Sequence, residues 1–338
     1  MRRQYIDFEE IAKLLPLIKA AQRSAKASAK HAQTQRFLAE LEWRCGELSE
    51  ALIQGTYRPK SFHSFMIRDP KPRWISAAPF TDRVVHHSLC AALEPRFERY
   101  AYEHSYACRK GKGTHLAIQQ VQAATRQGQY SLKLDIKHYF ETIPHLQLKE
   151  MVRRLVKGKE TLNLCDLLID NVPERHQKGY GLPIGNLTSQ HFANLYLGQL
   201  DHYISHLRGT TVTLGQITYF RYMDDLVFIA NQKEDLRLIE DLVKTKLETL
   251  GLTLKQSARR LTPITEGLAF LGCRIWPQLI RFDGARRRRM HRKLKQVYSS
   301  KLDDDSLQQR LSALHSWANH CGARHLMYTW HNQRQIGL

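Results

Sequence analysis

Two adjacent aspartates, Asp224 and Asp225, stand between two β-prone runs in the stretch YFRYMDDLVFIA, residues 219 to 230. Each negative side chain makes its neighbour harder to ionise, in a chain whose formal net charge is +20. One interpretation is a solvated turn, in which water screens both carboxylates. The other is a divalent cation that neutralises them, since Mg²⁺ prefers hard oxygen ligands.

A third carboxylate, Asp135, stands near the end of the alternating stretch YSLKLDI, which begins at Tyr130. Leu132 and Leu134 would face one side of a half-buried strand, with the polar residues between them on the other side. If this strand lies beside the hairpin of residues 217 to 230, three aspartates converge. Two Mg²⁺ ions about 4 Å apart, held by such carboxylates, are what phosphoryl transfer to a nucleic-acid strand needs.

The chain carries 52 Lys and Arg against 32 Asp and Glu. This excess positive charge favours a polyanion, so nucleic acid is the expected partner. A membrane surface is the weaker alternative, because the basic residues are spread along the chain and form no single amphipathic anchor. No segment approaches the roughly 18 apolar residues of a membrane span, and acidic residues interrupt the basic N-terminus, so we expect an unexported protein.

The cysteines are widely separated and form no C-x-x-C pair. This spacing argues against both a zinc module and a disulfide framework. We expect buried thiols in a reducing cytoplasm. The six residues are Cys45, Cys90, Cys108, Cys165, Cys273 and Cys321.

At 338 residues and 42% apolar side chains, the chain can bury a core for two or three subdomains. Residues 1 to 55 are rich in helix formers and predict a helical N-terminal layer. Prolines and β-prone runs in residues 57 to 79 predict short strands and loops. A helix is expected to begin with Thr81 or Asp82 as its capping residue, and another with Pro144 as its first residue.

The stretch GYGLPIGNLTSQ, residues 179 to 190, predicts a loop that leads into a helix, because its glycines allow unusual backbone angles and an apolar stripe follows at helical spacing. The glycine-bearing loop, more than the stripe, suggests a ligand. A further helix is expected over residues 236 to 250, ended by Gly251. Together these elements predict an α+β fold, a sheet with helices on one side.

Between Arg281 and Ser300, eight Lys or Arg residues occur against Asp283 alone. We interpret this segment as a short basic helical domain that grips a phosphate backbone, with a merely solvated face as the alternative. The residues expected to bind nucleic acid are Arg286, Arg287, Arg288, Arg289, Arg292 and Lys293.

The order of these motifs resembles that of reverse transcriptases. YMDD within a hairpin is similar to their catalytic turn, and LKLDIKHYFETI to their first carboxylate motif. PKPRWISAAPFTDRVVHHSL resembles the fingers region, GLPIGNLTSQ the template and nucleotide loop, and AFLGCRIW the primer grip. The resemblance covers about residues 57 to 277. It implies a right-hand polymerase, with fingers and palm in residues 1 to 275 and a basic helical thumb in residues 276 to 338.

Within this family, LPIGNLTSQ, YACRKGKGTH and RYMDD look like the reverse transcriptases of diversity-generating retroelements, which belong to the group II intron-like superfamily. This resemblance implies that a template-repeat RNA is copied into cDNA, with errors concentrated at template adenines, to diversify a target gene. It also implies a small basic oligomeric accessory protein as a partner, besides template RNA, cDNA or primer, and dNTPs. The alternatives are a group II-like or phage-defence reverse transcriptase and a non-catalytic RNA-binding protein.

The resemblance assigns roles to individual residues. Two Mg²⁺ ions, for which Mn²⁺ can substitute, would be held by Asp135, Asp224, Asp225 and the carbonyl of Ile136. The incoming nucleotide would meet Lys71, Arg73, Phe140, Ile184 and Gly185. Phe140 would exclude a ribose 2′ hydroxyl by steric clash. Lys255 is either the general acid that protonates the leaving pyrophosphate or a solvated surface lysine.

Ile184 departs from many accurate reverse transcriptases, which resemble this loop but have Gln at the position. Isoleucine offers only apolar bulk, and the loss of a polar contact removes about 1–3 kcal/mol of discrimination. About 1.4 kcal/mol is a factor of ten. We therefore expect Ile184 to relax selection opposite adenine; the alternative is that it merely packs the loop.

Overall fold

The computed structural model describes residues 3–26, 28–68, 72–210, 216–300 and 304–320. They form two compact units whose chain segments alternate along the sequence. Unit 1 comprises Met1–Glu103, Ile136–Ser205 and Val243–Leu254. Unit 2 comprises His104–Asp135, His206–Leu242 and Lys255–Leu338.

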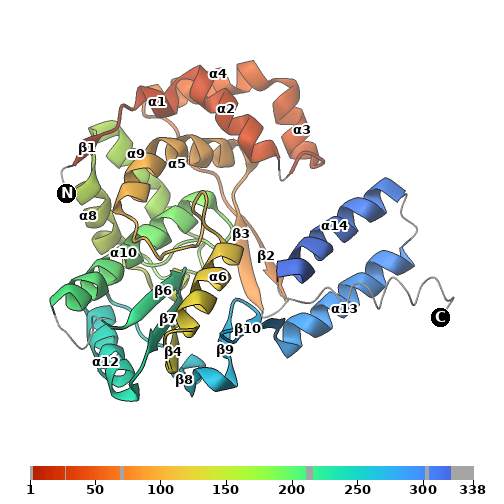
Figure 1. Ribbon diagram of the computed structural model, residues 1–338. Coiled ribbons are helices and arrows are strands. Elements are labelled where there is room, and N and C mark those ends of the chain that lie inside the picture. Colours follow the sequence, from red (N-terminus) through yellow and green to blue (C-terminus); the bar gives the residue numbers. More distant parts are fainter. Residues whose placement is uncertain (1–2, 27, 69–71, 211–215, 301–303, 321–338) are drawn as a thin grey trace. The chain divides into compact units, whose positions relative to one another are not determined.

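Unit 1 begins with the predicted helical layer, which the structure confirms. The layer contains α1 (Glu9–Ala12), α2 (Leu14–Ala25), α3 (Ala32–Ala39) and α4 (Leu41–Ile53). The first three of these helices contact the long helix α5 (Phe80–Tyr100), as Figure 1 shows. Ser88 ties α5 to this layer by donating a hydrogen bond of 2.7 Å to the carbonyl of Ile11.

The expected cap of α5 is wrong, because the helix begins at Phe80 after Pro79 and has no side-chain cap. Asp82 lies inside the first turn and is 1% exposed. Its carboxylate accepts hydrogen bonds from the hydroxyl of Tyr57, at 2.9 Å, and from the backbone N–H of Lys60, at 2.8 Å. Asp82 therefore anchors the preceding strand-and-loop region instead of capping the helix.

The remaining elements of unit 1 include the predicted short strands, which form the antiparallel hairpin β2–β3. The short strand β1 pairs in parallel with β5. Pro144 precedes α8 as its N-cap residue and is not the first helical residue. These elements are β1 (Gln4–Tyr5), β2 (His63–Ile67), β3 (Arg73–Ala77), α7 (Tyr139–Thr142), α8 (His145–Leu155), β5 (Val156–Lys157), α9 (Lys159–Asp170) and most of α10 (Leu187–Thr210).

Unit 2 contains a four-stranded antiparallel sheet in the order β6-β7-β4-β8. Its strands are β4 (Tyr130–Asp135), β6 (Thr218–Tyr222), β7 (Asp225–Ala230) and β8 (Arg260–Pro263). The half-buried strand and the hairpin predicted from the sequence are both confirmed. Helix α6 (Thr114–Thr125) contacts β6, and α12 (Lys233–Thr249) follows β7. The end of α12 belongs to unit 1, as does Gly251, which follows the helix as expected in a left-handed conformation.

One apolar cluster runs through unit 2 from the sheet to the C-terminal helices. It includes Phe220 and Val227 of the sheet, Val121 of α6, and Met290 and Leu294 of the basic segment. The other elements that contribute to it are β9 (Leu268–Phe270), β10 (Cys273–Ile275), β11 (Ile280–Phe282), α13 (Gly284–Ser299) and α14 (Asp304–His320). The paired strands β10 and β11 lie on either side of the domain boundary expected after residue 275. That boundary stays a prediction.

The cysteine prediction is confirmed for four residues and wrong for one. Cys45, Cys90, Cys165 and Cys273 are buried, whereas Cys108 is exposed and Cys321 lies outside the described residues. Cys108 follows the buried Tyr106 and Ala107 at the start of a turn and has a positive φ of 53°. Among the described helices, none is both long and apolar enough to cross a membrane.

Candidate active site

Strand register brings two of the three predicted carboxylates together in unit 2. Asp135, the last residue of β4, is the direct partner of Asp225, the first residue of β7. Residues paired in this way across antiparallel strands have Cβ atoms about 4.5–5.5 Å apart. Asp224 immediately precedes Asp225 in the turn, and all three side chains are partly exposed. We call Asp135, Asp224 and Asp225 the carboxylate corner.

The turn of the hairpin is two residues long, since Tyr222 pairs with Asp225 on either side of Met223 and Asp224. Met223 has a positive φ of 56°, which is uncommon for a residue with a side chain and stores strain. Arg221, 1% exposed, donates from Nη1 to the Met223 carbonyl at 3.2 Å. This arginine was not predicted as a site residue; its signal is its position directly before YMDD.

A lysine also lies at the carboxylate corner. Lys133 precedes Asp135 by two residues on β4, and its Nζ lies 2.9 Å from Oδ1 of Asp225. The two side chains are only 20% and 24% exposed. Sequence reasoning placed Lys133 on the same strand face as Asp135 but gave it no role, because period-2 alternation cannot identify a cross-strand partner.

Lys255 is placed beside the same strand end through its backbone. Its N–H donates to the carbonyl of Asp135 at 2.8 Å, and its side chain is half-buried. Lys255 also precedes the short 3₁₀ helix Gln256–Ala258. The neighbouring Ile136, whose carbonyl is a predicted ligand, is buried and forms an isolated antiparallel bridge with Leu254 in unit 1.

The carboxylate corner fits Mg²⁺ in the chemistry of its donors and in backbone position. Carboxylate oxygens are hard ligands, and the Nζ of Lys133 already occupies a cation position at Asp225. Over the described ranges, however, no three His, Cys, Asp or Glu side chains are gathered closely enough to form a ready-made metal cluster. The side chains of the corner would therefore have to reorient when a metal binds.

The described members of the predicted nucleotide set, Arg73, Phe140, Ile184 and Gly185, lie in unit 1, where backbone hydrogen bonds hold Phe140 and Ile184. We call residues 179 to 186 the glycine loop. Ser76 of β3 donates to the carbonyl of Ile184 at 2.8 Å, and Leu182 donates to the carbonyl of Phe140 at 2.6 Å. Ile184 and Phe140 are both half-buried. The loop is thus attached both to β3 and to α7.

Asn186 fixes the end of the glycine loop against β3. Its Oδ1 accepts from the N–H of Ala78 at 3.2 Å, and its Nδ2 donates to the carbonyl of Ser76 at 2.9 Å. Gly185 has a φ of 117°, and a Cβ there would stand 2.8 Å from Cγ2 of Ile75. Glycine at this position is required by both the backbone angle and the close approach of β3.

Arg73 is exposed at the start of β3, opposite Ile67, while Lys71 lies outside the described residues. Arg175, which was not predicted, donates to Ser64 at 3.1 Å and to Ser76 at 2.5 Å. Its guanidinium also lies 5.4 Å from the centre of the Trp74 ring. These contacts hold the segment before the glycine loop against the β2–β3 hairpin.

Helix α13 separates the predicted nucleic-acid contacts into two groups. Arg286 is half-buried, donates to the carbonyl of Leu271 and lies 5.8 Å from the Phe282 ring. Arg289 is also half-buried. Arg287, Arg288, Arg292 and Lys293 are exposed. The exposed group can meet phosphates without breaking fold contacts.

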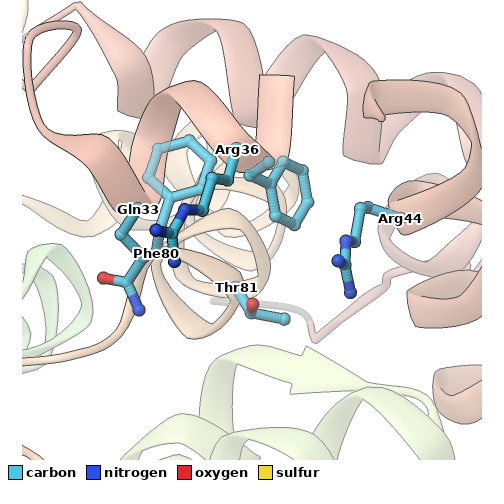
Figure 2. Close-up of a pocket in the computed structure, with 6 residues that line it drawn as sticks. Gln33, Arg36, Arg44, Phe80 and Thr81 are labelled. Atoms are coloured by element: carbon cyan, nitrogen blue, oxygen red, sulfur yellow. The ribbon is translucent and has the colours of Figure 1, made fainter. Parts of the chain in front are cut away.

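Unit 1 also has a pocket of about 430 Å³ that sequence reasoning did not anticipate. Figure 2 shows Gln33 and Arg36 on one side of it and Arg44 on the other, with Thr81 between them. Arg44 is ion-paired with Glu40 at 2.8 Å. The pocket therefore carries less positive charge than its two arginines suggest.

Comparison with known proteins identifies the family. The family model "Reverse transcriptase (RNA-dependent DNA polymerase)" matches residues 67–275, more than half of the chain. Protein YkfC of Escherichia coli is 24% identical over 266 residues, covering 68% of this chain and 70% of YkfC. The group II intron-encoded protein LtrA of Lactococcus lactis is 23% identical over 175 residues, 49% of this chain and 29% of LtrA.

The retron Ec83 reverse transcriptase of Escherichia coli is 31% identical over 121 residues, 35% of this chain and 38% of that protein. Among solved structures, telomerase from Candida tropicalis in complex with a fragment of telomeric RNA matches with a TM-score of 0.53 at 12% identity, over 80% of this chain and 56% of that one. This likeness confirms the predicted α+β polymerase fold. The chain belongs to the reverse transcriptase (RNA-dependent DNA polymerase) family.

Proposed function

We propose that this chain is an RNA-directed DNA polymerase that extends a primer with dNTPs along an RNA template. Family membership supports the reaction class. The observation that carries the proposal is the direct pairing of Asp135 with Asp225 across β4 and β7, beside Asp224 in the turn. A solvated turn alone gives no reason for a carboxylate from another strand to meet the hairpin at this position.

In this proposal Asp135, Asp224, Asp225 and the carbonyl of Ile136 hold two Mg²⁺ ions, with Mn²⁺ as a possible substitute. When bound, the two ions would activate the primer 3′ hydroxyl and stabilise the leaving pyrophosphate. Lys255, whose backbone is bonded to Asp135, would supply a proton to that pyrophosphate.

The nucleotide is assigned to the residues of unit 1. Arg73, with Lys71, would donate charge-assisted hydrogen bonds to the triphosphate. Phe140 would exclude a ribose by contact with its 2′ hydroxyl, and its backbone bond to Leu182 keeps it beside the glycine loop. Ile184 and Gly185 would pack against the base and sugar. The exposed basic residues of α13 would bind the template and primer backbone, with a binding constant that falls as salt rises.

Primer extension tests the catalytic proposal. Wild type should incorporate dNTPs on a primed RNA in Mg²⁺, Asp224→Asn should lose this activity, and Glu234→Gln, an exposed acid on α12, should keep it. Equal activity in wild type and Asp224→Asn, or none in either while the RNA is still bound, would instead support a non-catalytic RNA-binding protein.

A finer proposal is that the enzyme belongs to a diversity-generating retroelement. It would copy a template-repeat RNA with errors at adenines, together with a small basic accessory protein. Ile184 supports this, since its apolar side chain is half-buried in a loop held by β3 and offers the nucleotide no polar contact. Misincorporation on an adenine-bearing template should fall about tenfold in Ile184→Gln, whereas an unchanged error rate would remove the role of Ile184.

A group II-like, retron-like or phage-defence reverse transcriptase is the second candidate. The matches to LtrA and to the retron Ec83 enzyme favour it. Sequencing of RNA and cDNA bound to the protein purified with its neighbouring genes separates the two. A near-duplicate repeat pair that differs at adenines supports the retroelement, and a structured RNA without such a pair supports the second candidate. We propose a cytoplasmic location for either, in keeping with the buried cysteines Cys45, Cys90 and Cys165.

A further inference from the structure

The ion pair between Lys133 and Asp225 joins the proposed metal site to a cation of the protein itself. Lys133 faces Val227 across the β4–β7 ladder, while Asp135 faces Asp225. Lys133 must therefore reach diagonally, over one residue pair, to place its Nζ 2.9 Å from Oδ1 of Asp225. Diagonal neighbours on one strand face are within reach of a long side chain.

Burial makes this pair more than a surface contact. Exposed ion pairs contribute little because water screens them. Here the side chain of Lys133 is 20% exposed and that of Asp225 is 24% exposed. The acceptor, Asp225, also faces a second carboxylate, Asp135. Such like charges across a strand pair repel each other, and a nearby ammonium offsets that repulsion.

We propose that Lys133 is a positioning residue that competes with a divalent cation for Asp225. Without metal, its ammonium holds the Asp225 carboxylate and compensates part of the negative charge of the corner. When a divalent ion binds, Lys133 must release Oδ1. The lysine therefore raises the metal concentration at which the site fills. This inference rests on the proposed function, because it assumes that the carboxylate corner binds metal.

The chain provides a matched control for the charge of Lys133. Arg260 on β8 is the direct partner of Lys133 on the other side of β4. It is exposed and donates to the carbonyls of Ser257 and Arg259. Arg260→Gln removes one positive charge at the same level of the sheet but leaves the contact with Asp225 in place.

The experiment measures Mn²⁺ binding to the free protein by electron paramagnetic resonance, without nucleic acid or dNTP. Lys133→Gln should bind Mn²⁺ roughly tenfold more tightly than wild type, because a competitor and a like charge are both removed. Arg260→Gln should change the affinity by less than about twofold, since exposed charges are screened. Lys133→Arg, which keeps the charge, should stay close to wild type.

Thermal unfolding gives a second readout that does not depend on activity. Without metal, Lys133→Gln should melt below wild type, and the difference should shrink as Mn²⁺ is added. If Lys133→Gln does not fold, Lys133→Met preserves the length of the stem and carries the same expectations.

Two negative outcomes are distinct. If wild type and Asp225→Asn bind Mn²⁺ equally, the corner is not a metal site, and both the proposed function and the role of Lys133 are wrong. If Asp225→Asn loses the site but Lys133→Gln binds no more tightly than wild type, or Arg260→Gln tightens binding equally, only the Lys133 proposal is overturned.

Discussion

The carboxylate corner and the glycine loop are held in place by different means. In the corner, Asp135 and Asp225 are positioned by the regular ladder of β4 and β7, so their own side chains do not create the geometry. In the glycine loop, the geometry depends on the hydrogen bonds of the Asn186 side chain and on the absence of a side chain at Gly185. Side chains in the corner can therefore be specialised for chemistry, whereas several in the loop serve structure first.

Substitution of a carboxylate in the corner should remove the chemistry without loss of the fold. Asp135→Asn should reduce primer extension by about a hundredfold to a thousandfold, because one proposed metal ligand is lost. Its melting temperature should stay equal or rise, since one of two facing like charges is removed. Glu234→Gln provides the control. A melting temperature that falls with the activity would mean that the side chain of Asp135 holds the corner together.

In the glycine loop, by contrast, loss of a side chain should lower the stability of the fold. Asn186→Ala should lower the free energy of unfolding by about 2–4 kcal/mol, because the buried N–H of Ala78 and carbonyl of Ser76 lose their partner. Primer extension should fall as well, by a rise in the KM for dNTP. Denaturant unfolding measures the first effect, and Asn163→Ala, exposed on α9, is the matched control. An unchanged stability would show that the loop does not depend on this side chain.

Two glycines of the same loop separate backbone strain from steric contact. Gly185 and Gly179 both have positive φ angles, 117° and 81°, but a Cβ at Gly179 would meet nothing within 4 Å. Gly185→Ala should therefore destabilise the protein by about 1–3 kcal/mol more than Gly179→Ala, since only the former also presses on Ile75. Equal losses in thermal or denaturant unfolding would leave backbone strain as the sole cause.

A further effect concerns pH and lies away from both the corner and the loop. Burial lowers the pKa of His86 on α5 to about 3, with help from the charges of His87 and Arg83. In the unfolded chain a histidine has a pKa of about 6.5. Between these values the unfolded chain binds a proton that the folded chain does not, so stability falls as the pH drops below about 6.5.

At pH 5, His86 should account for a loss of about 2 kcal/mol relative to neutral pH. Urea unfolding at pH 7.5 and 5.0 measures this loss of stability. The difference between the two pH values should be smaller in His86→Gln than in wild type, and unchanged in His63→Gln, which is exposed on β2. The same pH difference in all three proteins would mean that His86 is not kept neutral.

The parts of the site that follow local rules could be predicted from the sequence. Alternation of apolar and polar residues placed Asp135 at the end of a strand, and β-prone runs around YMDD predicted the hairpin. The direct pairing of Asp135 with Asp225 required a register between distant segments, which local pattern does not contain. Lys133 was missed as a site residue for the same reason.

Long-range hydrogen bonds also explain the errors. Aspartate is a residue type that often caps helices, yet the carboxylate of Asp82 is hydrogen-bonded to Tyr57 and to the backbone of Lys60. Asn186 directly precedes α10, at the position of a helix cap, and its side chain instead bonds to the backbone of Ser76 and Ala78. Both polar side chains form hydrogen bonds with residues that are distant in the sequence, and not with the backbone of the adjacent helix.

The proposed function depends on the binding of the catalytic metal by the carboxylate corner. Its most direct test is a crystal structure with primed RNA, a non-hydrolysable dNTP analogue and Mn²⁺, located by anomalous scattering. We expect two Mn²⁺ peaks about 4 Å apart, with oxygen atoms of Asp135 and Asp225 as ligands and Lys133 displaced from Asp225. A bound primer and nucleotide with no anomalous peak at these carboxylates would show that the corner does not bind the catalytic metal.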